Sequence, residues 1–252
     1  PNEHTEQMSK WERKTFEALL TYNKTLGNHN FGALAGWHAE GYEYKYWKTY
    51  RQGFPSSSVT DINAGDASTQ KGEGYTRKLN MLSWFGRINY DFAGRYLLEA
   101  NLRADASSRF ADGHRWGYFP SFSAGWRVSE EAFMENTKSW LSNLKIRGSW
   151  GQMGNDNISK YQYLSTYQFT QTGAYFGAGE KGSINKGFYL TRTANPLVTW
   201  ETANTLNLGI SSTFLNNKFS LDIDWFQSRR RDILIRRNAS IPSYCQMKTW
   251  AR

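Results

Sequence analysis

Side chains able to support catalysis or metal binding are few in this sequence and lie far apart. It has one cysteine, Cys245, and four histidines, which are His4, His29, His38 and His114. The histidines lack the spacing of a metal site, and Asp156, between two asparagines, lacks the spacing of an EF-hand calcium loop. We therefore expect no catalytic residue, no metal and no cofactor, and a single cysteine excludes an intrachain disulfide.

Two glycine-rich stretches could suggest phosphate binding. They are GQMGNDN at residues 151–157 and GAGEKGSINKG at residues 177–187. A phosphate cradle needs a strand before the glycines and a helix after them. Neither stretch has that context, so we predict that both are loops.

The stretch RFADGHRWGYFP, residues 109–120, concentrates side chains that can stack on a sugar or peptide and hydrogen-bond to it. The candidates for substrate or loop-packing contacts are Arg109, His114, Arg115, Trp116 and Tyr118. The aromatic residues could instead pack the loop down or form part of the aromatic girdle of a membrane protein. The residues alone leave both interpretations open.

Positive charge is concentrated near the end of the sequence. The net charge is +9, and much of the excess lies in RRRDILIRR, residues 229–237. This cluster is not a continuous basic face, so we expect no nucleic-acid partner. Arg229, Arg230 and Arg231 could contact lipopolysaccharide phosphates or form a merely solvated rim.

The elements that must position these residues are strands, because apolar and polar residues alternate along eight stretches. In GRYLLEANLRADASSRF, residues 94–110, every second residue from Tyr96 to Ala104 is apolar, as in a two-faced strand. Similar rows begin near Phe16, Phe31, Leu82, Phe122, Leu144, Leu206 and Phe219. The polar residues predicted to lie on the opposite, lumen-facing side are Arg87, Glu99, Asn101, Arg103, Asp105, Arg127 and Arg147.

The composition permits a membrane barrel. Aromatic residues make up 16% of the chain, including 11 Trp and 15 Tyr, while the mean hydropathy is −0.71. No run of about 18 apolar residues is present, which excludes a membrane helix. Alternating barrel strands keep mean hydropathy low and place Tyr and Trp at the membrane interfaces.

The predicted connections alternate between short and long. Tight turns are expected at LGNH (26–29), FAGR (92–95) and FLNNK (214–218), where Gly and Asn adopt positive φ. Long loops are expected at 49–75, 106–119 and 151–199. The stretch SEEAFMENTKSWLSN lies on the short side and is predicted to hold a turn or two of helix. This sorting is typical of an outer-membrane barrel, with the apolar rows in lipid and the polar rows facing water.

Three long blocks resemble the SusC/RagA-type TonB-dependent outer-membrane transporters. They run from FGRINYDF to SEEAFM (85–134), from WLSNLKIRG to GQMGND (140–156), and from NPLVTWET to SRRRDIL (195–234). The resemblance implies a barrel of about 22 strands that encloses a plug. It further implies TonB-driven import of glycans or peptides, a SusD-like surface lipoprotein as partner, and the outer membrane of a Bacteroidetes-like Gram-negative bacterium.

On this resemblance, residues 1–252 form one partial barrel domain. We expect an all-β, antiparallel up-and-down meander of about eight strands, open in this chain. The plug, the TonB-interacting segment and the C-terminal strands are expected to be absent, and the final CQMKTWAR departs from the family pattern. Because block 109–120 is shared while substrates differ, the resemblance favours a structural role there, in the aromatic girdle or in packing the loop, over substrate contact. The same holds for NPLVTWET, residues 195–202. The expected activity is transport, not catalysis.

Two alternatives remain. The first is a complete eight-stranded barrel that acts as a small porin or adhesin, since eight strands can close. The second is a secreted carbohydrate-binding β-protein, which would need no detergent, whereas a barrel wall aggregates without it.

Overall fold

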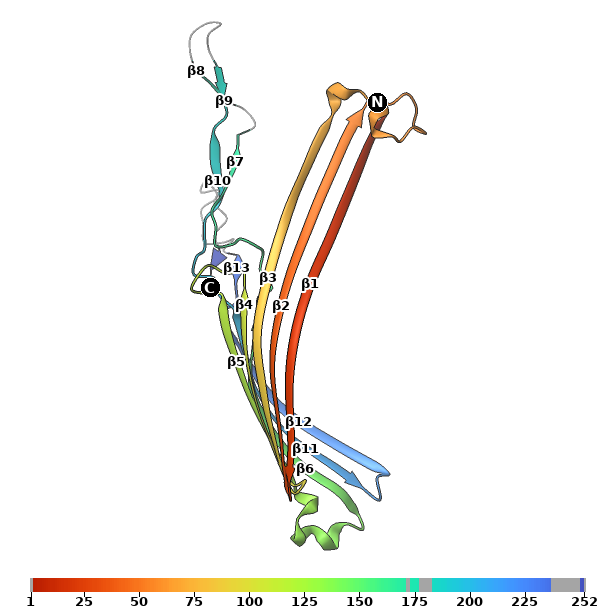
Figure 1. Cartoon of the computed structure of the whole chain (residues 1–252), viewed down its shortest axis with the longest axis vertical. Coiled ribbons are helices and arrows are strands. Elements are labelled where there is room, and N and C mark those ends of the chain that lie inside the picture. The colour runs from red at the N-terminus through yellow and green to blue at the C-terminus, as the bar shows by residue number, and fades with distance from the viewer. Residues whose placement is uncertain (1, 171–172, 177–182, 237–249, 252) are drawn as a thin grey trace. The chain divides into compact units, whose positions relative to one another are not determined.

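The chain forms β-strands and short 3₁₀ helices in a computed structural model that describes residues 2–170, 173–176, 183–236 and 250–251. Eight strands form one sheet in the order β1-β2-β3-β4-β5-β6-β11-β12 (Figure 1). They are β1 Glu3–Leu26, β2 His29–Gln52, β3 Lys71–Phe92, β4 Tyr96–Ser107, β5 Trp116–Arg127, β6 Leu141–Asn155, β11 Glu201–Phe214 and β12 Phe219–Arg231. The sheet is open, because β1 and β12 are not neighbours. The predicted open meander of about eight strands is confirmed.

Shorter elements lie in the connections. Three strand pairs are β7 Thr166–Phe169 with β10 Phe188–Arg192, β8 Ala174–Phe176 with β9 Ser183–Asn185, and β13 Ile235–Arg236 with β14 Trp250–Ala251. The 3₁₀ helices are η1 Ile62–Ala64, η2 Ala67–Thr69, η3 Val128–Glu130 and η4 Ala132–Thr137. Within the described ranges, no helix has the length and apolar character needed to cross a membrane.

The chain divides into two compact units. Unit 1 comprises Pro1–Glu17 and His38–Leu82, and unit 2 comprises Ala18–Trp37 and Ser83–Arg252. In unit 1, the connection between β2 and β3 folds over Phe54, which is buried. The guanidinium of Arg51 donates to the carbonyl oxygens of Asn63 at 3.4 Å and Gly65 at 3.2 Å, which fixes this connection beside the end of β2.

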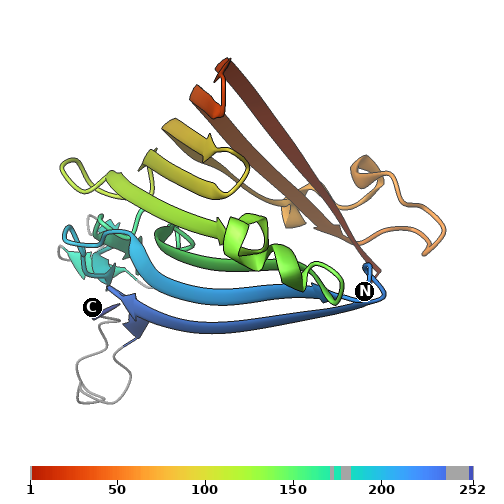
Figure 2. The same cartoon turned by 90° about the horizontal axis from the view of Figure 1, so that it is seen from below.

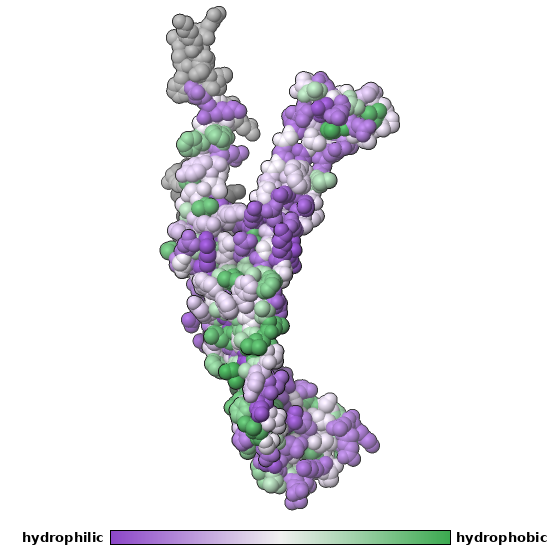
Figure 3. Space-filling model, viewed as in Figure 1, coloured by the Kyte–Doolittle hydropathy of each residue, from purple (hydrophilic) through white to green (hydrophobic). Residues whose placement is uncertain are grey.

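Unit 2 contains β4, β5, β6, β11 and β12, and each pair of neighbours among them is antiparallel. Figure 2 shows β5, β6, β11 and β12 side by side, with η3 and η4 at the end of β5. In the space-filling view of Figure 3, apolar side chains gather over the strands of unit 2. Alternation along each strand therefore produces a two-faced sheet.

Several predicted boundaries were wrong because the strands run further than their apolar rows. The long connections reduce to residues 53–70 and 108–115, and β6 continues to Asn155. The rest of the predicted loop 151–199 contains β7 to β10, so it is not simply a loop. The strands are longer because polar and aromatic residues beyond the apolar rows still pair their backbone groups with neighbouring strands.

The three tight turns are confirmed, and so is the helical character of the segment after β5, which forms η3 and η4. Gly27 and Gly94 adopt positive φ of 60° and 68°. Asn216 and Asn217 also adopt positive φ as predicted, and Ala93 and Leu215 do so as well, with φ of 54° and 52°. Backbone hydrogen bonds hold both residues, from Ala93 N to Asn28 O at 2.7 Å and from Leu215 N to Trp140 O at 2.9 Å.

Candidate functional site: the polar face of the sheet

The strand register of unit 2 assigns each residue to one of two faces. Residues directly opposite each other on neighbouring strands share a face. One row across the five strands is Leu98, Ala124, Gly148, Leu208 and Trp225, and the adjacent row is Glu99, Ser123, Ser149, Asn207 and Phe226. Unit 2 therefore has an apolar face and a polar face.

The apolar face is open in the described chain. Large side chains are about half exposed there, with 53% for Leu98, 55% for Phe122 and 58% for Ile223. Soluble monomers rarely expose contiguous apolar patches of this kind. The face therefore needs an apolar medium to cover it.

The charged residues of the polar face pair with one another. The Nε of Arg103 donates to both carboxylate oxygens of Asp105 at 2.8 Å, and its Nη2 donates to Ser83 Oγ at 3.0 Å. The guanidinium also lies 5.5 Å from the centre of the Phe85 ring. Asn101 donates to Glu99 at 2.8 Å. These contacts hold the side chains in fixed positions along the face.

A second network surrounds Arg147. Its Nη2 donates to Asp224 Oδ2 at 2.6 Å and its Nη1 to Ser211 Oγ at 2.7 Å, while Asp222 lies 3.8 Å away. A Cβ at Gly209 would meet Asp224 Oδ1 and Arg147 Nε, so these two side chains would have to shift to accept a larger residue there. Arg127 shares the face, since it lies opposite Lys145 in the register, and Arg87 alternates with the outward Trp84 and Ile88 of β3.

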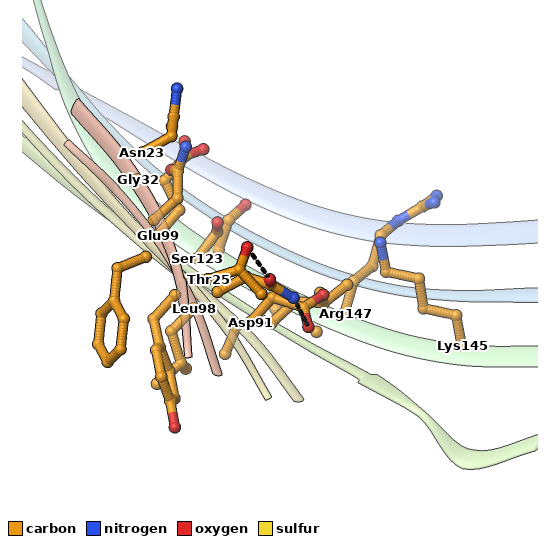
Figure 4. A pocket seen from close by; sticks show the side chains of 18 of the residues that line it. Asn23, Thr25, Gly32, Asp91, Leu98, Glu99, Ser123, Lys145 and Arg147 are labelled. Atoms are coloured by element: carbon orange, nitrogen blue, oxygen red, sulfur yellow. Dashed lines mark hydrogen bonds between the residues drawn. The ribbon is translucent and has the colours of Figure 1, made fainter. Parts of the chain in front are cut away.

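A hollow of about 670 Å³ lies beside Glu99 and Arg147. Small residues form part of its lining, among them Gly32, Ser123, Gly125 and Ser149. Glu99, Lys145 and Arg147 extend to one side of the ribbon, whereas Leu98 extends to the other (Figure 4). Asn30 donates to Asp91 at 3.4 Å and accepts from Thr25 at 2.8 Å. The hollow offers hydrogen-bonding groups of both charges to a hydrated solute.

The polar face carries charged and hydrogen-bonding side chains, among them Glu99, Lys145 and Arg147. Among the residues that the structure describes, no three His, Cys, Asp or Glu side chains group closely enough to hold a metal ion. Part of the second glycine-rich stretch, residues 177–182, and the single cysteine, Cys245, lie outside the described residues.

The sequence matches the family described as "TonB dependent receptor-like, beta-barrel" over residues 2–247. The chain belongs to this family of TonB-dependent receptor barrels. It is 31% identical to TonB-dependent receptor P3 of Formosa agariphila, over 90% of this chain and 22% of that protein. It is also 31% identical to TonB-dependent receptor SusC of Bacteroides thetaiotaomicron, over 87% of this chain and 21% of that protein.

Solved structures give the same fold. The RagAB peptide transporter superposes with a TM-score of 0.85 at 23% identity, over 98% of this chain and 26% of that chain. The predicted SusC/RagA-type resemblance is confirmed, and these relatives are receptors and transporters, not enzymes. The chain spans about a fifth of the length of the receptors P3 and SusC.

The predicted contact residues of block 109–120 do not form one site. Arg109 lies 3.3 Å from Asp156 and donates to the carbonyl oxygen of Ile158, while Ser107 Oγ donates to Asp156 at 2.7 Å. Arg115 pairs with Asp112 at 3.0 Å. Both arginines of the block thus contact other loop residues. His114 is half-buried, and its backbone N–H donates to Ala111 O at 3.1 Å.

Trp116 and Tyr118 lie in strand β5, so their predicted place in a loop was wrong. They are opposite Ala106 and Ala104, in the same alternating row as Leu102. Their side chains are exposed on the apolar face and do not line the hollow. This placement follows from backbone pairing of β5 with β4, which begins at Trp116.

A buried aromatic core near the starts of β5 and β11 was not predicted from the sequence. Phe110, with no exposed surface, and Phe119 each lie 5.3 Å from the Trp200 ring. The indole N–H of Trp200 donates to Arg115 O at 2.8 Å, and Val198 is buried close by in sequence. The aromatic residues in blocks 109–120 and 195–202 were the only hint of this core in the sequence. Their spacing does not predict that the two blocks contact each other.

The arginine triplet divides between the two faces. Arg230 lies 3.8 Å from Glu201, whereas Arg229 and Arg231 alternate with it and lie opposite Asn204 and Thr202. The sequence analysis considered the three arginines as one group, but alternation along the strand places Arg230 on one face and the other two on the opposite face. Contact between Arg229 or Arg231 and lipid phosphates stays a prediction.

A cluster around one carboxylate, Glu131, at the short-turn end was also not predicted. Glu131 accepts hydrogen bonds from the Tyr96 hydroxyl at 2.6 Å and the Trp126 indole at 3.0 Å, and Arg95 lies 3.4 Å away. The hydroxyl of Tyr96, the indole of Trp126 and the charge of Arg95 hold the pKa of Glu131 below its ordinary value of 4.5. The cluster attaches the segment of η3 and η4 to β4 and β5.

Proposed function

We propose that residues 1–252 form part of the wall of a TonB-dependent importer of oligosaccharides or peptides in the bacterial outer membrane. The longer protein would also contain a plug, a TonB-interacting segment and further strands, and would work with a SusD-like surface lipoprotein. The relative named SusC and the RagAB peptide transporter support this class of function.

The observation that carries the proposal is the two-faced sheet of unit 2. Its apolar face is exposed, which suits contact with lipid, since charges on that face would cost roughly 2–4 kcal/mol at the membrane midplane. Its polar face carries Glu99, Arg103 and Arg147 along a hydrated path. The mechanism is gated passage, in which the wall provides hydrogen bonds to solute and the plug controls access.

The two alternatives are less well supported. A complete eight-stranded porin needs β1 to pair with β12, and these strands are not neighbours in the sheet order. A secreted carbohydrate-binding protein would leave the apolar face of Leu98 and Phe122 in water.

Uptake measurements test the proposal. Cells that produce the full-length protein should accumulate labelled oligosaccharides or peptides, and deletion of its gene or an uncoupler of the proton gradient should abolish this uptake. Uptake that survives the uncoupler, together with ion conductance by the 252-residue chain alone in bilayers, would instead support the small porin.

Sidedness provides a second test. In a full-length variant that lacks Cys245, a cysteine at Ser57 should react with an impermeant thiol reagent on intact cells. Cysteines at Asn28 or Asn216, in the tight turns, should react only after the outer membrane is permeabilised. Ala178, predicted to share the side of Ser57, lies outside the described residues. The reverse labelling pattern would contradict the orientation.

A further inference from the structure

Unit 1 carries a cluster of aromatic rings across three neighbouring strands. The ring centre of Trp11 in β1 lies 5.5 Å from that of Tyr44 in β2. The ring centre of Tyr75 in β3 lies 5.8 Å from that of Tyr44 and 5.2 Å from that of Tyr46. We refer to Trp11, Tyr44, Tyr46 and Tyr75 as the aromatic platform. Tyr44 and Tyr46 are two residues apart on β2, so both rings lie on the same face of the strand.

The platform is accessible. The side chain of Trp11 is 64% exposed, Tyr75 is also exposed, and Tyr44 and Tyr46 are half-buried. The guanidinium of Arg77 lies 4.4 Å from the centre of the Tyr75 ring. Trp11 is therefore the ring with most surface available to a ligand.

Several charges beside the platform form ion pairs. On the same face, Arg13 lies 3.6 Å from Glu40, and Lys48 lies 3.5 Å from Glu73. Glu3 accepts a hydrogen bond from the Tyr50 hydroxyl at 2.9 Å. The two ion pairs cancel, whereas the guanidinium of Arg77 on the Tyr75 ring adds a positive charge to the platform.

Hydroxyl groups add hydrogen-bonding capacity at the rings. The Tyr44 hydroxyl lies 3.1 Å from Ser9 Oγ, and either atom can donate. A tyrosine ring presents an apolar surface with a polar edge. This combination matches a pyranose, which has C–H groups on its faces and hydroxyl groups around its rim.

We propose that the aromatic platform binds a neutral, linear oligosaccharide, with one sugar stacked on Trp11 and the next unit over Tyr44. This inference rests on the proposed import function and adds a substrate class and a binding site. A peptide fits the rings of β2 and β3 less well, because peptides commonly add to a free strand edge and both of these strands pair on both sides. Of the three platform strands, only β1 has an open edge in the described sheet.

Trp47 provides a matched control on the same unit. It alternates with Tyr46 on β2, so it lies on the opposite face, and it is 46% exposed. Loss of a binding contact should therefore follow from Trp11→Ala and not from Trp47→Ala. General damage to unit 1 would affect both variants.

The test uses the full-length protein in detergent and isothermal titration calorimetry. The probes are neutral hexasaccharides of α-1,4-glucose, β-1,4-glucose, β-1,4-mannose and β-1,4-xylose, with mixed-sequence hexapeptides as the comparison. At least one hexasaccharide should bind, and Trp11→Ala should weaken its affinity roughly tenfold or more, as truncation of a central aromatic contact does. Trp11→Phe should restore part of the affinity, and Trp47→Ala should leave it unchanged.

Three results would overturn the proposal. They are no binding of any hexasaccharide, equal losses from Trp11→Ala and Trp47→Ala, and Trp11-dependent binding of the hexapeptides alone. Uptake by cells separates this failure from failure of the import function. Normal import of the bound sugar by the Trp11→Ala variant would reject the platform and leave import intact, whereas no energy-dependent import by the unmodified protein would reject import itself.

Discussion

Apolar side chains are buried on one face of the unit 2 sheet and exposed on the other. On the polar face, loops cover Phe110, Phe119 and Trp200, which are buried. On the apolar face, Leu98 and Phe122 are exposed although they are equally apolar. The protein therefore buries apolar groups where its own loops reach, whereas the other face depends on an external apolar medium.

The largest expected effect is loss of the buried core on the polar face. Phe110→Ala should lower the free energy of unfolding by about 3–5 kcal/mol, because it removes a fully buried ring and leaves a cavity. Urea titration of the full-length protein in detergent measures this. Trp116→Ala, on the apolar face, is the control and should cost clearly less. Equal losses would show that the two faces do not differ as described.

Charge on the apolar face should have the next largest effect. Leu102→Arg should cost roughly 2–4 kcal/mol near the bilayer midplane, and Leu98→Asp somewhat less. Asn101→Asp should cost little, because its side chain is on the polar face. The folded fraction after assembly into bilayers measures all three variants, and equal yields would contradict the lipid-facing assignment.

The ion pairs of the polar face should contribute weakly, because water reaches them. A double-mutant cycle of Arg147→Ala and Asp224→Ala should give a coupling energy of about 1 kcal/mol or less, as exposed ion pairs do. High salt should reduce it further. A coupling several times larger would mean that this face is dry, and would weaken the assignment of an aqueous lumen.

A small pH effect is expected at the short-turn end. The pKa of Glu131 is held below its ordinary value by Tyr96, Trp126 and Arg95. A group of this kind stabilises the fold above its unfolded pKa and loses that contribution as the pH falls through its folded pKa. Stability measured from pH 7 to pH 3 should therefore fall less steeply in Glu131→Gln than in the unmodified protein, and identical slopes would contradict this role.

Alternation and turn residues were sufficient to predict the sheet. The apolar rows give the strands and their faces, because a one-residue shift would exchange lipid and water for every side chain. Turn sequences such as LGNH predict the three short connections. Strand ends could not be predicted, since Trp116 and Tyr118 extend β5 through backbone pairing with β4 and not through any local signal.

The side-chain partners were less predictable. The polar face of Arg103 and Arg147 follows from alternation, but their partners Ser83 and Asp224 lie on strands distant in sequence. Arg109 was a candidate for substrate contact, and its position beside Asp156 depends on how two connections meet. Such contacts are set by the folded arrangement of loops, which carries no periodic signal.

A spin-label scan along β4 tests whether the two faces of the sheet meet different media. In the full-length protein without Cys245, nitroxides placed one at a time at residues 98–102 are exposed to oxygen, which concentrates in lipid, and to a water-soluble nickel chelate. We expect oxygen access to peak at Leu98, Ala100 and Leu102, and nickel access to peak at Glu99 and Asn101. Accessibility without this two-residue period, or with the two reagents exchanged, would contradict a wall with lipid on one face and water on the other.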